Sequence, residues 1–326
     1  MPVILDSKIR INRNIKNFKF PARISKKDSD IIVDKVWDIV LPMGYEKKYI
    51  KDFSDIKKLE LFEEEIITDD LLKNINKSAV FLKEGSPSIL VNEIDHIVIQ
   101  DERDTLDLDE SYKLCKGIEE ILSTNVDYSF NDDFGFLTSE IMSCGMGLVP
   151  SVTVHIPGIS YFGVESLVER LNKLGYEIKG LYLKNGKVVG NLYKIYPSRS
   201  IGLSEESLIE KLKNISLEVM SMEKEKRKKI YFSDLVELED IVNRSYGILK
   251  YAKRMQEEEM IFHLSNICLG VELSIIKANI DFDIMESIKN LRSGHIQIEY
   301  GSILDIKSID ILRANKVRKW IKEVFE

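Results

Sequence analysis

The apolar stretch at residues 91–100, VNEIDHIVIQ, carries polar residues where a buried strand would have none. From Ile97 to Ile99 every residue is β-branched, which is typical of a strand buried on both faces and predicts a strand here. Its first half nevertheless contains Asn92, Glu93, Asp95 and His96. Buried polar groups need hydrogen-bond partners. Either Asp95 and His96 satisfy one another and the nearby backbone, or the four residues belong to a functional site.

The hydrophobic pattern predicts a mixture of strands and helices before residue 204. Residues 1–24 are basic and read as an extended arm or strand with turns, and residues 101–110 as an acidic loop. Helical spacing is found at 28–40, 111–123 and 164–174. Alternation predicts strands at 152–156, 176–183 and 188–196. Asn185-Gly186 between the last two predicts a hairpin turn.

From Ser204 onward the pattern is helical. Ser204 is a candidate N-cap, and apolar residues recur at helical spacing from Leu208 to Met222. The charged run that follows, EKEKRKK at 223–229, is expected to be solvated helix surface. We expect a domain boundary near residue 230, which divides the chain into 1–229 and 230–326. The apolar face that contains Leu264 and Ile267 reads as core more readily than as interface.

Composition describes an ordinary soluble globular protein. The 326 residues are 44% hydrophobic and 31% charged, with a net charge of -7 that argues against broad nucleic-acid binding. Three widely spaced cysteines and four scattered histidines give no metal-ligand spacing, so no metal is expected. The N-terminus has no signal-peptide pattern, and no segment stays apolar for long enough to cross a membrane. We therefore expect a cytoplasmic protein without membrane contact.

The order of several motifs resembles the bacterial protein-arginine kinases of the McsB type, relatives of the creatine and arginine phosphagen kinases. LDSKIRINRN is similar to the family's Ser-Ser-Arg-x-Arg-x-x-Arg-Asn opening, and VNEIDHIVIQ to its Asn-Glu-Glu-Asp-His-x-Arg-x-Gln segment. FGFLTSEIMSCGMGLVPSVTVHIP, IKGLYLKNGKVVGNLYKI, IVNRSYGIL and HLSNICLGVELSII follow further family motifs in order. The resemblance implies an α+β fold: a glutamine-synthetase-like catalytic domain, with an antiparallel sheet flanked by helices, and an all-helical C-terminal domain.

The family transfers a phosphoryl group between ATP and a guanidinium, which requires carboxylates that hold the guanidinium and help to remove its proton. A guanidinium has a pKa above about 12 and is no nucleophile while protonated. The family's second Glu of Asn-Glu-Glu-Asp-His corresponds here to Ile94, and two loop glutamates correspond to Lys184 and Lys187. The family's reactive cysteine corresponds to Glu140, and the nearby Cys144 is interpreted as structural. No catalytic residue is therefore expected.

The phosphate-binding positions implied by the resemblance are also altered. The family's arginines correspond to Lys8, Arg10, Val98, Val149 and Lys179, so one arginine remains, two positions carry lysine and two carry valine. Each lost charge-assisted hydrogen bond costs about 1.5–3 kcal/mol, so tight ATP binding is not expected, and neither ATP nor magnesium is expected as a cofactor. Asn92, Glu93, Asp95 and His96 are interpreted as the retained framework of this vestigial site.

A last family element recognises phosphoarginine in the helical domain. Here it reads Ile309-Asp310-Ile311-Leu312-Arg313-Ala314, so Asp310 and Arg313 remain, and they also fit an ordinary helical ion pair. The resulting hypothesis is an inactive, kinase-like protein that acts through protein–protein contacts, as a homodimer or as a heterodimer with a paralogue. The alternatives are an active ATP-dependent protein-arginine kinase, or a sensor that binds a nucleotide or phosphoarginine without turnover.

Overall fold

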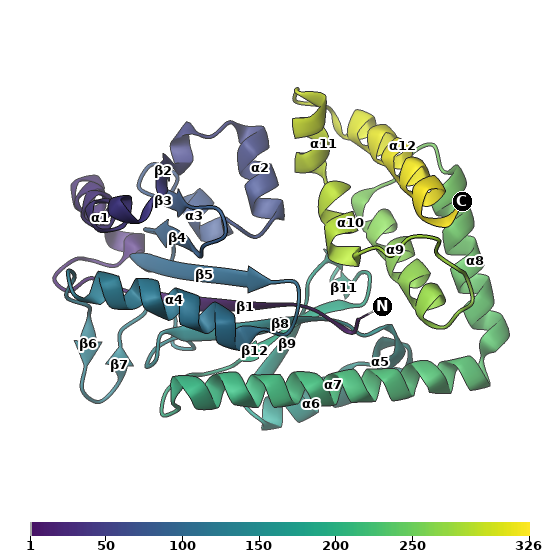
Figure 1. Ribbon diagram of the computed structural model, residues 1–326, viewed down its shortest axis with the longest axis horizontal. Helices are drawn as coiled ribbons and strands as arrows, with labels where there is room; N and C mark the ends of the chain where they lie inside the picture. Colours follow the sequence, from purple (N-terminus) through teal and green to yellow (C-terminus); the bar gives the residue numbers. More distant parts are fainter. Residues whose placement is uncertain (1) are drawn as a thin grey trace.

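A single eight-stranded antiparallel sheet forms the centre of the first domain in the computed structural model, which describes residues 2–326 (Figure 1). The strand order is β2-β3-β4-β5-β1-β8-β12-β9. Its strands are β1 (Ile4–Arg13), β2 (Glu46–Tyr49), β3 (Ala79–Leu82), β4 (Ser88–Val91), β5 (Ile97–Arg103), β8 (Leu148–His155), β9 (Tyr176–Gly180) and β12 (Leu192–Pro197). Two small hairpins stand apart from it: β6 (Phe130–Asn131) with β7 (Gly135–Phe136), and β10 (Leu183–Lys184) with β11 (Lys187–Val188).

Helices lie on both sides of this sheet and form the whole C-terminal domain. Those before residue 234 are α1 (Lys26–Val40), α2 (Asp55–Glu63), α3 (Asp69–Lys73), α4 (Leu108–Ser123), α5 (Pro157–Phe162), α6 (Glu165–Lys173) and α7 (Glu205–Ser233). The C-terminal ones are α8 (Leu235–Tyr251), α9 (Glu257–Glu272), α10 (Ile284–Asn290), α11 (Ser293–Tyr300) and α12 (Ile306–Phe325). Single 3-10 turns occupy Pro21–Arg23, Leu41–Met43 and Ile50–Asp52. This is the expected α+β fold with a helical C-terminal part.

The two faces of the sheet differ because side chains alternate along each strand. Ile9 and Ile11 of β1 point into a large core shared with α1, α4, α6 and α7. The opposite face carries Lys8, Arg10 and Asn12, which pair in register with Glu102, Gln100 and Val98 of β5. One face is therefore apolar and covered by helices, whereas the other presents a row of charged and polar side chains.

The predicted single strand at 91–100 is wrong. β4 ends at Val91 and β5 begins at Ile97, and a tight loop joins them in which the Asn92 amide donates to the His96 carbonyl at 2.9 Å. Asn92 has a φ of 57°, a left-handed conformation that asparagine tolerates better than most residues. The polar residues thus occupy a hairpin loop, and only the β-branched half of the segment is strand.

The expectation that residues 223–229 form a solvated surface is also wrong in part. Lys224, Glu225 and Lys228 are exposed, but Glu223 and Arg227 are buried one helical turn apart. The Glu223 carboxylate accepts from the Gly158 and Ile159 amides at 2.8 and 2.7 Å, at the start of α5. Arg227 donates to Glu223 at 2.7 Å, so this part of α7 is anchored by a buried ion pair.

Other predicted elements are confirmed. Ser204 accepts from the Ser207 amide and begins α7, and Asn185 and Gly186 have φ of 51° and 76° in the β10–β11 turn. The predicted domain boundary near 230 falls in the last turn of α7 and stays a prediction. Leu264 and Ile267 are fully buried in the C-terminal core, as the core interpretation of that face expects. None of the helices that the structure describes is long and apolar enough to cross a membrane.

Candidate functional site

The β4–β5 loop is held against β1 by Asp95. One carboxylate oxygen accepts from the Asn14 side chain at 2.5 Å and from the Ser139 amide at 2.8 Å, and the other accepts from the Asn12 side chain at 3.0 Å. Asp95 is fully buried and fixes the loop to β1 and to the segment after β7. Its partners come from two separate parts of the chain, and their hydrogen bonds satisfy the buried carboxylate without a counter-ion.

His96 and Asn92 bind backbone groups and do not contact Asp95 through a hydrogen bond. The His96 Nδ1 atom accepts from the Ile15 amide at 3.0 Å, so Nε2 carries the proton that is donated to the Lys19 carbonyl at 2.9 Å. Burial lowers the pKa of His96, which keeps the ring neutral. The Asn92 side chain donates to two carbonyls, those of Ser29 and Lys77. Both residues therefore shape the loop.

Arg10 and Glu93 form the central ion pair of the polar face. The Arg10 Nη2 atom lies 2.8 and 2.6 Å from the two carboxylate oxygens of Glu93. Thr68 donates a further hydrogen bond to Glu93. Burial acts to raise the pKa of Glu93, but the Arg10 charge and these hydrogen bonds outweigh it and hold the pKa below its ordinary value. The one retained arginine is therefore bound to a carboxylate of the protein itself.

Two of the three apolar replacements, Ile94 and Val98, occupy different environments. Val98 is fully buried on the covered end of the polar face, where it packs with residues of α2, α3, β3, β4 and the segments around α2: Ile50, Leu61, Ile67, Leu71, Val80 and Leu90. Ile94 is only half-buried in the loop. Its carbonyl accepts from the Ser139 hydroxyl at 2.7 Å. Val98 is a core residue, whereas Ile94 is a loop residue that belongs to none of the buried clusters.

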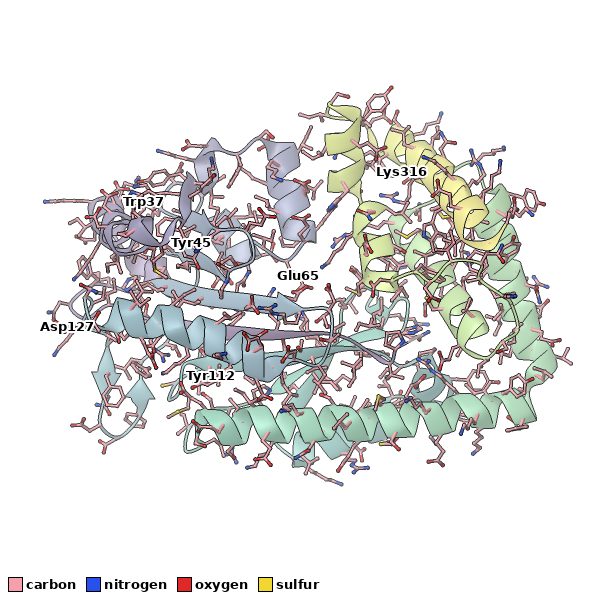
Figure 2. All side chains as sticks on the ribbon, in the orientation of Figure 1. Trp37, Tyr45, Glu65, Tyr112, Asp127 and Lys316 are labelled. Carbon is pink, nitrogen blue, oxygen red and sulfur yellow. The ribbon has the colours of Figure 1, made fainter. Side chains whose placement is uncertain are left out.

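Lys8 is enclosed by carboxylates. Its Nζ atom lies 3.2 Å from Glu102 and 3.7 Å from Glu65, which follows α2 on the side that faces the C-terminal helices (Figure 2). Lys194 of β12 pairs with the same Glu65, and Lys289 of α10 lies 3.3 Å from Glu102. Burial acts against ionisation, yet the charges of Lys194 and Lys8 lower the pKa of Glu65 to about 2.

The pKa of a second buried carboxylate in this charged cluster is shifted in the opposite direction. Burial, together with the nearby Glu102 carboxylate, raises the pKa of Asp6 to about 6. The cluster formed by Asp6, Lys8, Glu65, Glu102, Lys194 and Lys289 was not predicted. Only the alternation of Asp6, Lys8 and Arg10 hinted at it, because its members meet through strand register and through a helix of the other domain.

The remaining predicted phosphate-binding positions lie on the same face of the sheet. Val149 pairs in register with Arg10, and Lys179 pairs with Lys194. Val149 is half-buried and Lys179 is exposed. The five predicted positions are thus brought together by the sheet, with Val98 under the α2–α3 segment and the other four around the strand centres.

The predicted acceptor-side positions lie at the edge of this face. Lys184 and Lys187 face each other in the β10–β11 hairpin, and the Lys184 ammonium donates to the Gln256 side chain of the C-terminal domain at 3.1 Å. Glu140 is exposed, and burial of its carboxyl together with the nearby Asp95 raises its pKa. Cys144 is half-buried, with its sulfur 4.0 Å from the Phe134 carbonyl.

The Asp310–Arg313 pair lies at the start of α12. Arg313 Nη1 contacts Asp310 at 3.0 Å one turn away, which is the helical ion pair that the spacing allows. Its other donors reach two backbone carbonyls, the Ser293 hydroxyl at 2.8 Å and Glu257 at 3.3 Å. A cavity of about 560 Å³ lies beside this pair and also contains Lys184. All three guanidinium nitrogens of Arg313 therefore form hydrogen bonds within the protein.

Comparison with known families decides the relationship. The profile described as "ATP:guanido phosphotransferase, C-terminal catalytic domain" matches residues 38–226, and that of the "Protein-arginine kinase McsB C-terminal domain" matches residues 236–326. The chain belongs to the ATP:guanido phosphotransferase family, in its protein-arginine kinase branch. The two matches together span most of the described chain, and the family assignment that the motifs suggested is confirmed.

Relatives in this family are similar to the chain over most of their length. "Protein-arginine kinase" from Clostridium tetani is 30% identical, with 98% of this chain and 95% of that protein covered. The protein of the same name from Desulforamulus reducens is 31% identical, with 97% and 91% covered. Among solved structures, lombricine kinase has a TM-score of 0.58 at 15% identity, with 68% and 66% covered. A duplicated taurocyamine kinase from Schistosoma mansoni has a TM-score of 0.62 at 18% identity, with 74% of this chain and 37% of that chain covered. These structures share the fold.

Proposed function

We propose that this protein is a catalytically inactive member of its family, which acts through contacts with other proteins. The main support for this proposal is that cations of the polar face are already paired with carboxylates of the protein. Arg10 is bound to Glu93, and Lys8 is held between Glu65 and Glu102. Cations that already contact carboxylates must lose those contacts before they can bind a triphosphate. The residues present therefore do not fit ATP with magnesium.

The acceptor side supports the same proposal. Ile94 offers no group that can take a proton, and Lys184 and Lys187 repel a guanidinium. Glu140 is an exposed residue whose carboxyl pKa is raised by burial and by the nearby Asp95, with Arg10 acting in the opposite direction. No step of phosphoryl transfer is assigned to a residue of this chain.

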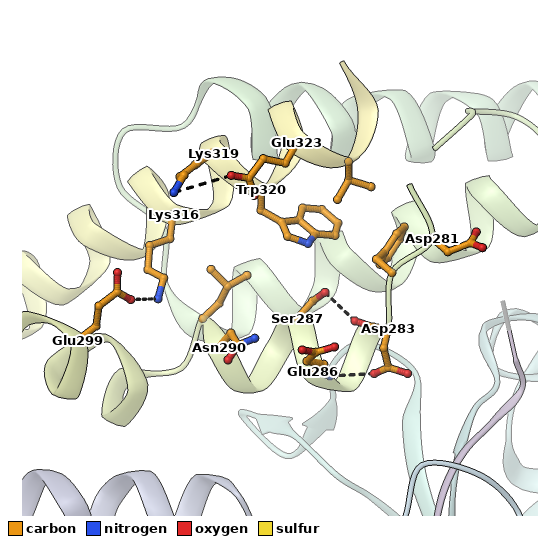
Figure 3. A pocket seen from close by; sticks show the side chains of 13 residues that line it. Asp281, Asp283, Glu286, Ser287, Asn290, Glu299, Lys316, Lys319, Trp320 and Glu323 are labelled. Carbon is orange, nitrogen blue, oxygen red and sulfur yellow. Dashed lines mark hydrogen bonds and ion pairs between the residues drawn. The ribbon is translucent and has the colours of Figure 1, made fainter. Parts of the chain in front are cut away.

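The partner is proposed to be a second copy of this chain or a kinase-like paralogue, bound through the C-terminal domain. Large apolar side chains are exposed around the α11–α12 connection: Tyr300 at 62%, Ile303 at 76% and Ile306 at 77%. We call these three residues the α11–α12 patch. A cavity of about 460 Å³ between α10, α11 and α12 is lined by Trp320 and by charged residues that include the Lys316–Glu299 pair (Figure 3). Exposed apolar groups of this size favour association.

A second candidate is a sensor that binds phosphoarginine without turnover. The cavity beside Arg313 favours it, because Lys184 and Arg313 supply two cations to one space. An active kinase is favoured by the name of the relatives, "Protein-arginine kinase". Neither alternative requires the pairing of Arg10 with Glu93.

Two measurements on the purified protein test the proposal. Calorimetric titration with ATP and magnesium is expected to give no binding tighter than the millimolar range, and a micromolar dissociation constant would favour the sensor or the kinase. Light scattering after size exclusion should give a dimer that Ile303→Asp with Ile306→Asp dissociates. The control Ile141→Asp, at a side chain that is 83% exposed on the other domain, should leave the mass unchanged. A monomeric parent that also recovers no paralogue would contradict the interaction role.

A further inference from the structure

The last turn of α2 faces the start of α11, and three potential metal ligands meet there. Glu60 lies in the last turn of α2, Glu64 is the C-cap residue of that helix, and His295 lies on α11. One ligand atom from each lies within 4.8 Å of the others. No pattern in the sequence predicts this group, because His295 and Glu64 are 231 positions apart.

The imidazole of His295 is oriented as in many metal sites. Its Nδ1 atom is buried, makes no hydrogen bond and faces a carboxylate oxygen of Glu63 at 3.6 Å. Glu63 is itself fixed, because both of its oxygens accept from the Gly294 amide at 2.9 Å. A metal-binding histidine usually directs its second nitrogen at a carboxylate in this manner, which fixes the ring and leaves the other nitrogen free to bind. Here that other nitrogen, Nε2, points at Glu64.

We propose that Glu60, Glu64 and His295 bind a divalent transition-metal ion, with Zn²⁺ as the best match. The His295 Nε2 atom lies 3.2 Å from Glu64 Oε1. Two ligands of a tetrahedral zinc ion with bonds of about 2.0–2.2 Å are separated by about 3.3 Å, so this pair already has the required spacing. One imidazole and two carboxylates suit zinc better than calcium or magnesium, which prefer oxygen alone.

The site is built on rigid elements and carries excess negative charge. A side chain at Gly294 would come within 2.6 Å of the Glu60 amide nitrogen, so glycine allows the two helices to approach closely. Lys57 pairs with Glu60 but is 41% exposed, so it can turn into solvent when an ion binds. A bound ion would join α2 of the first domain to α11 of the second, which lie side by side at the top of the molecule (Figure 1).

Zinc titration of chelator-treated protein, without nucleotide, tests this site. Calorimetry is expected to give one ion per chain with a micromolar or tighter dissociation constant. Zinc at 100 times that constant should raise the unfolding midpoint by about 4 °C. His295→Gln and Glu64→Gln should each weaken binding at least about tenfold. Lys57→Met should strengthen it, because the competing cation is gone.

The matched control is Asp55→Asn, an 87% exposed carboxylate on the same helix that should leave zinc binding unchanged. X-ray absorption of the zinc complex should show nitrogen and oxygen ligands without sulfur, which excludes binding at Cys144. Glu64 is 31% exposed, so its variant tests the site even if His295→Gln does not fold. Binding weaker than millimolar in the parent, or equal affinity in the parent and in Glu64→Gln, would overturn the proposal.

Discussion

One nitrogen of Arg10, Nη2, lies 2.8 and 2.6 Å from the two carboxylate oxygens of Glu93. The pair is asymmetric: the Glu93 side chain is 2% exposed, whereas that of Arg10 is 23% exposed. The arginine can regain water when its partner is removed, but the carboxylate cannot. Because of this difference in burial, substitutions of Arg10 and of Glu93 should change the free energy of unfolding by different amounts.

Removing the arginine should therefore cost more stability than removing the carboxylate charge. Arg10→Met leaves Glu93 buried and unpaired and should lower the free energy of unfolding by about 3–5 kcal/mol. Glu93→Gln should lower it by only about 1–2 kcal/mol. Urea unfolding of both variants measures the difference. Equal costs would mean that Glu93 is hydrated and that the polar face is open.

Substitutions of Val98 and Ile94 by the residues that the family carries there should have different effects on stability. Val98→Arg places a charge among fully buried side chains and should cost more than about 4 kcal/mol. Ile94→Glu, at a half-buried loop position, should cost less than about 1 kcal/mol. Thermal and urea unfolding compare the two variants. A tolerated Val98→Arg would show that the α2–α3 segment does not close over the sheet.

Glu65 should make the protein less stable in acid. Its folded pKa of about 2 lies below the unfolded value of 4.5, so its contribution is complete above pH 4.5 and is lost as the pH falls toward 2. The stability difference between the parent and Glu65→Gln should shrink over that range. Unfolding midpoints at several pH values measure it. A difference that is independent of pH would remove Glu65 from the charged cluster.

Asp6 should show the opposite trend. Its folded pKa of about 6 lies above the unfolded value of 3.8, so the stability it contributes is present below pH 3.8 and is lost as the pH rises through 6. Asp6→Asn, which stays neutral, should gain stability relative to the parent between pH 4 and pH 6 when urea unfolding is followed across that range. A constant difference would show that Asp6 ionises normally beside Lys194.

The buried part of α7 gives a test with a control on the same helix. Glu223→Ala removes the partner of buried Arg227 and of two α5 amides, and should cost about 3–5 kcal/mol. Glu225→Ala changes an exposed residue of the same charged run and should stay within about 0.5 kcal/mol. Denaturant unfolding compares the two variants. Similar losses of unfolding free energy would mean that Glu223 is solvated like the rest of the charged run.

The sequence predicted the elements of the fold well wherever local chemistry decides them. Ser204 caps α7, Asn185-Gly186 makes its turn and the β-branched residues from Ile97 to Ile99 form strand, because each depends on neighbours in the chain. The charged run at 223–229 was misread because burial of Glu223 depends on α5, which lies 64 and 65 positions away.

The sequence predicted which residues form the candidate site, but not which contacts those residues make. Motif order located Arg10, Glu93, Asp95 and His96, and the structure brings them together on β1 and the β4–β5 loop. Motif order could not predict that Lys8 lies between Glu65 and Glu102, because those contacts depend on strand register and on the chain after α2. The difference between Val98 and Ile94 likewise depends on which side chains the fold places over the sheet.

The main proposal is that this protein does not transfer a phosphoryl group from ATP to arginine. The most direct measurement is mass spectrometry of phosphoarginine, after incubation of the purified protein with magnesium, ATP and an arginine-rich substrate protein. We expect no more phosphoarginine on either protein than in a reaction without ATP. Phosphoarginine that forms in the parent and disappears in Arg10→Ala would instead establish an active kinase.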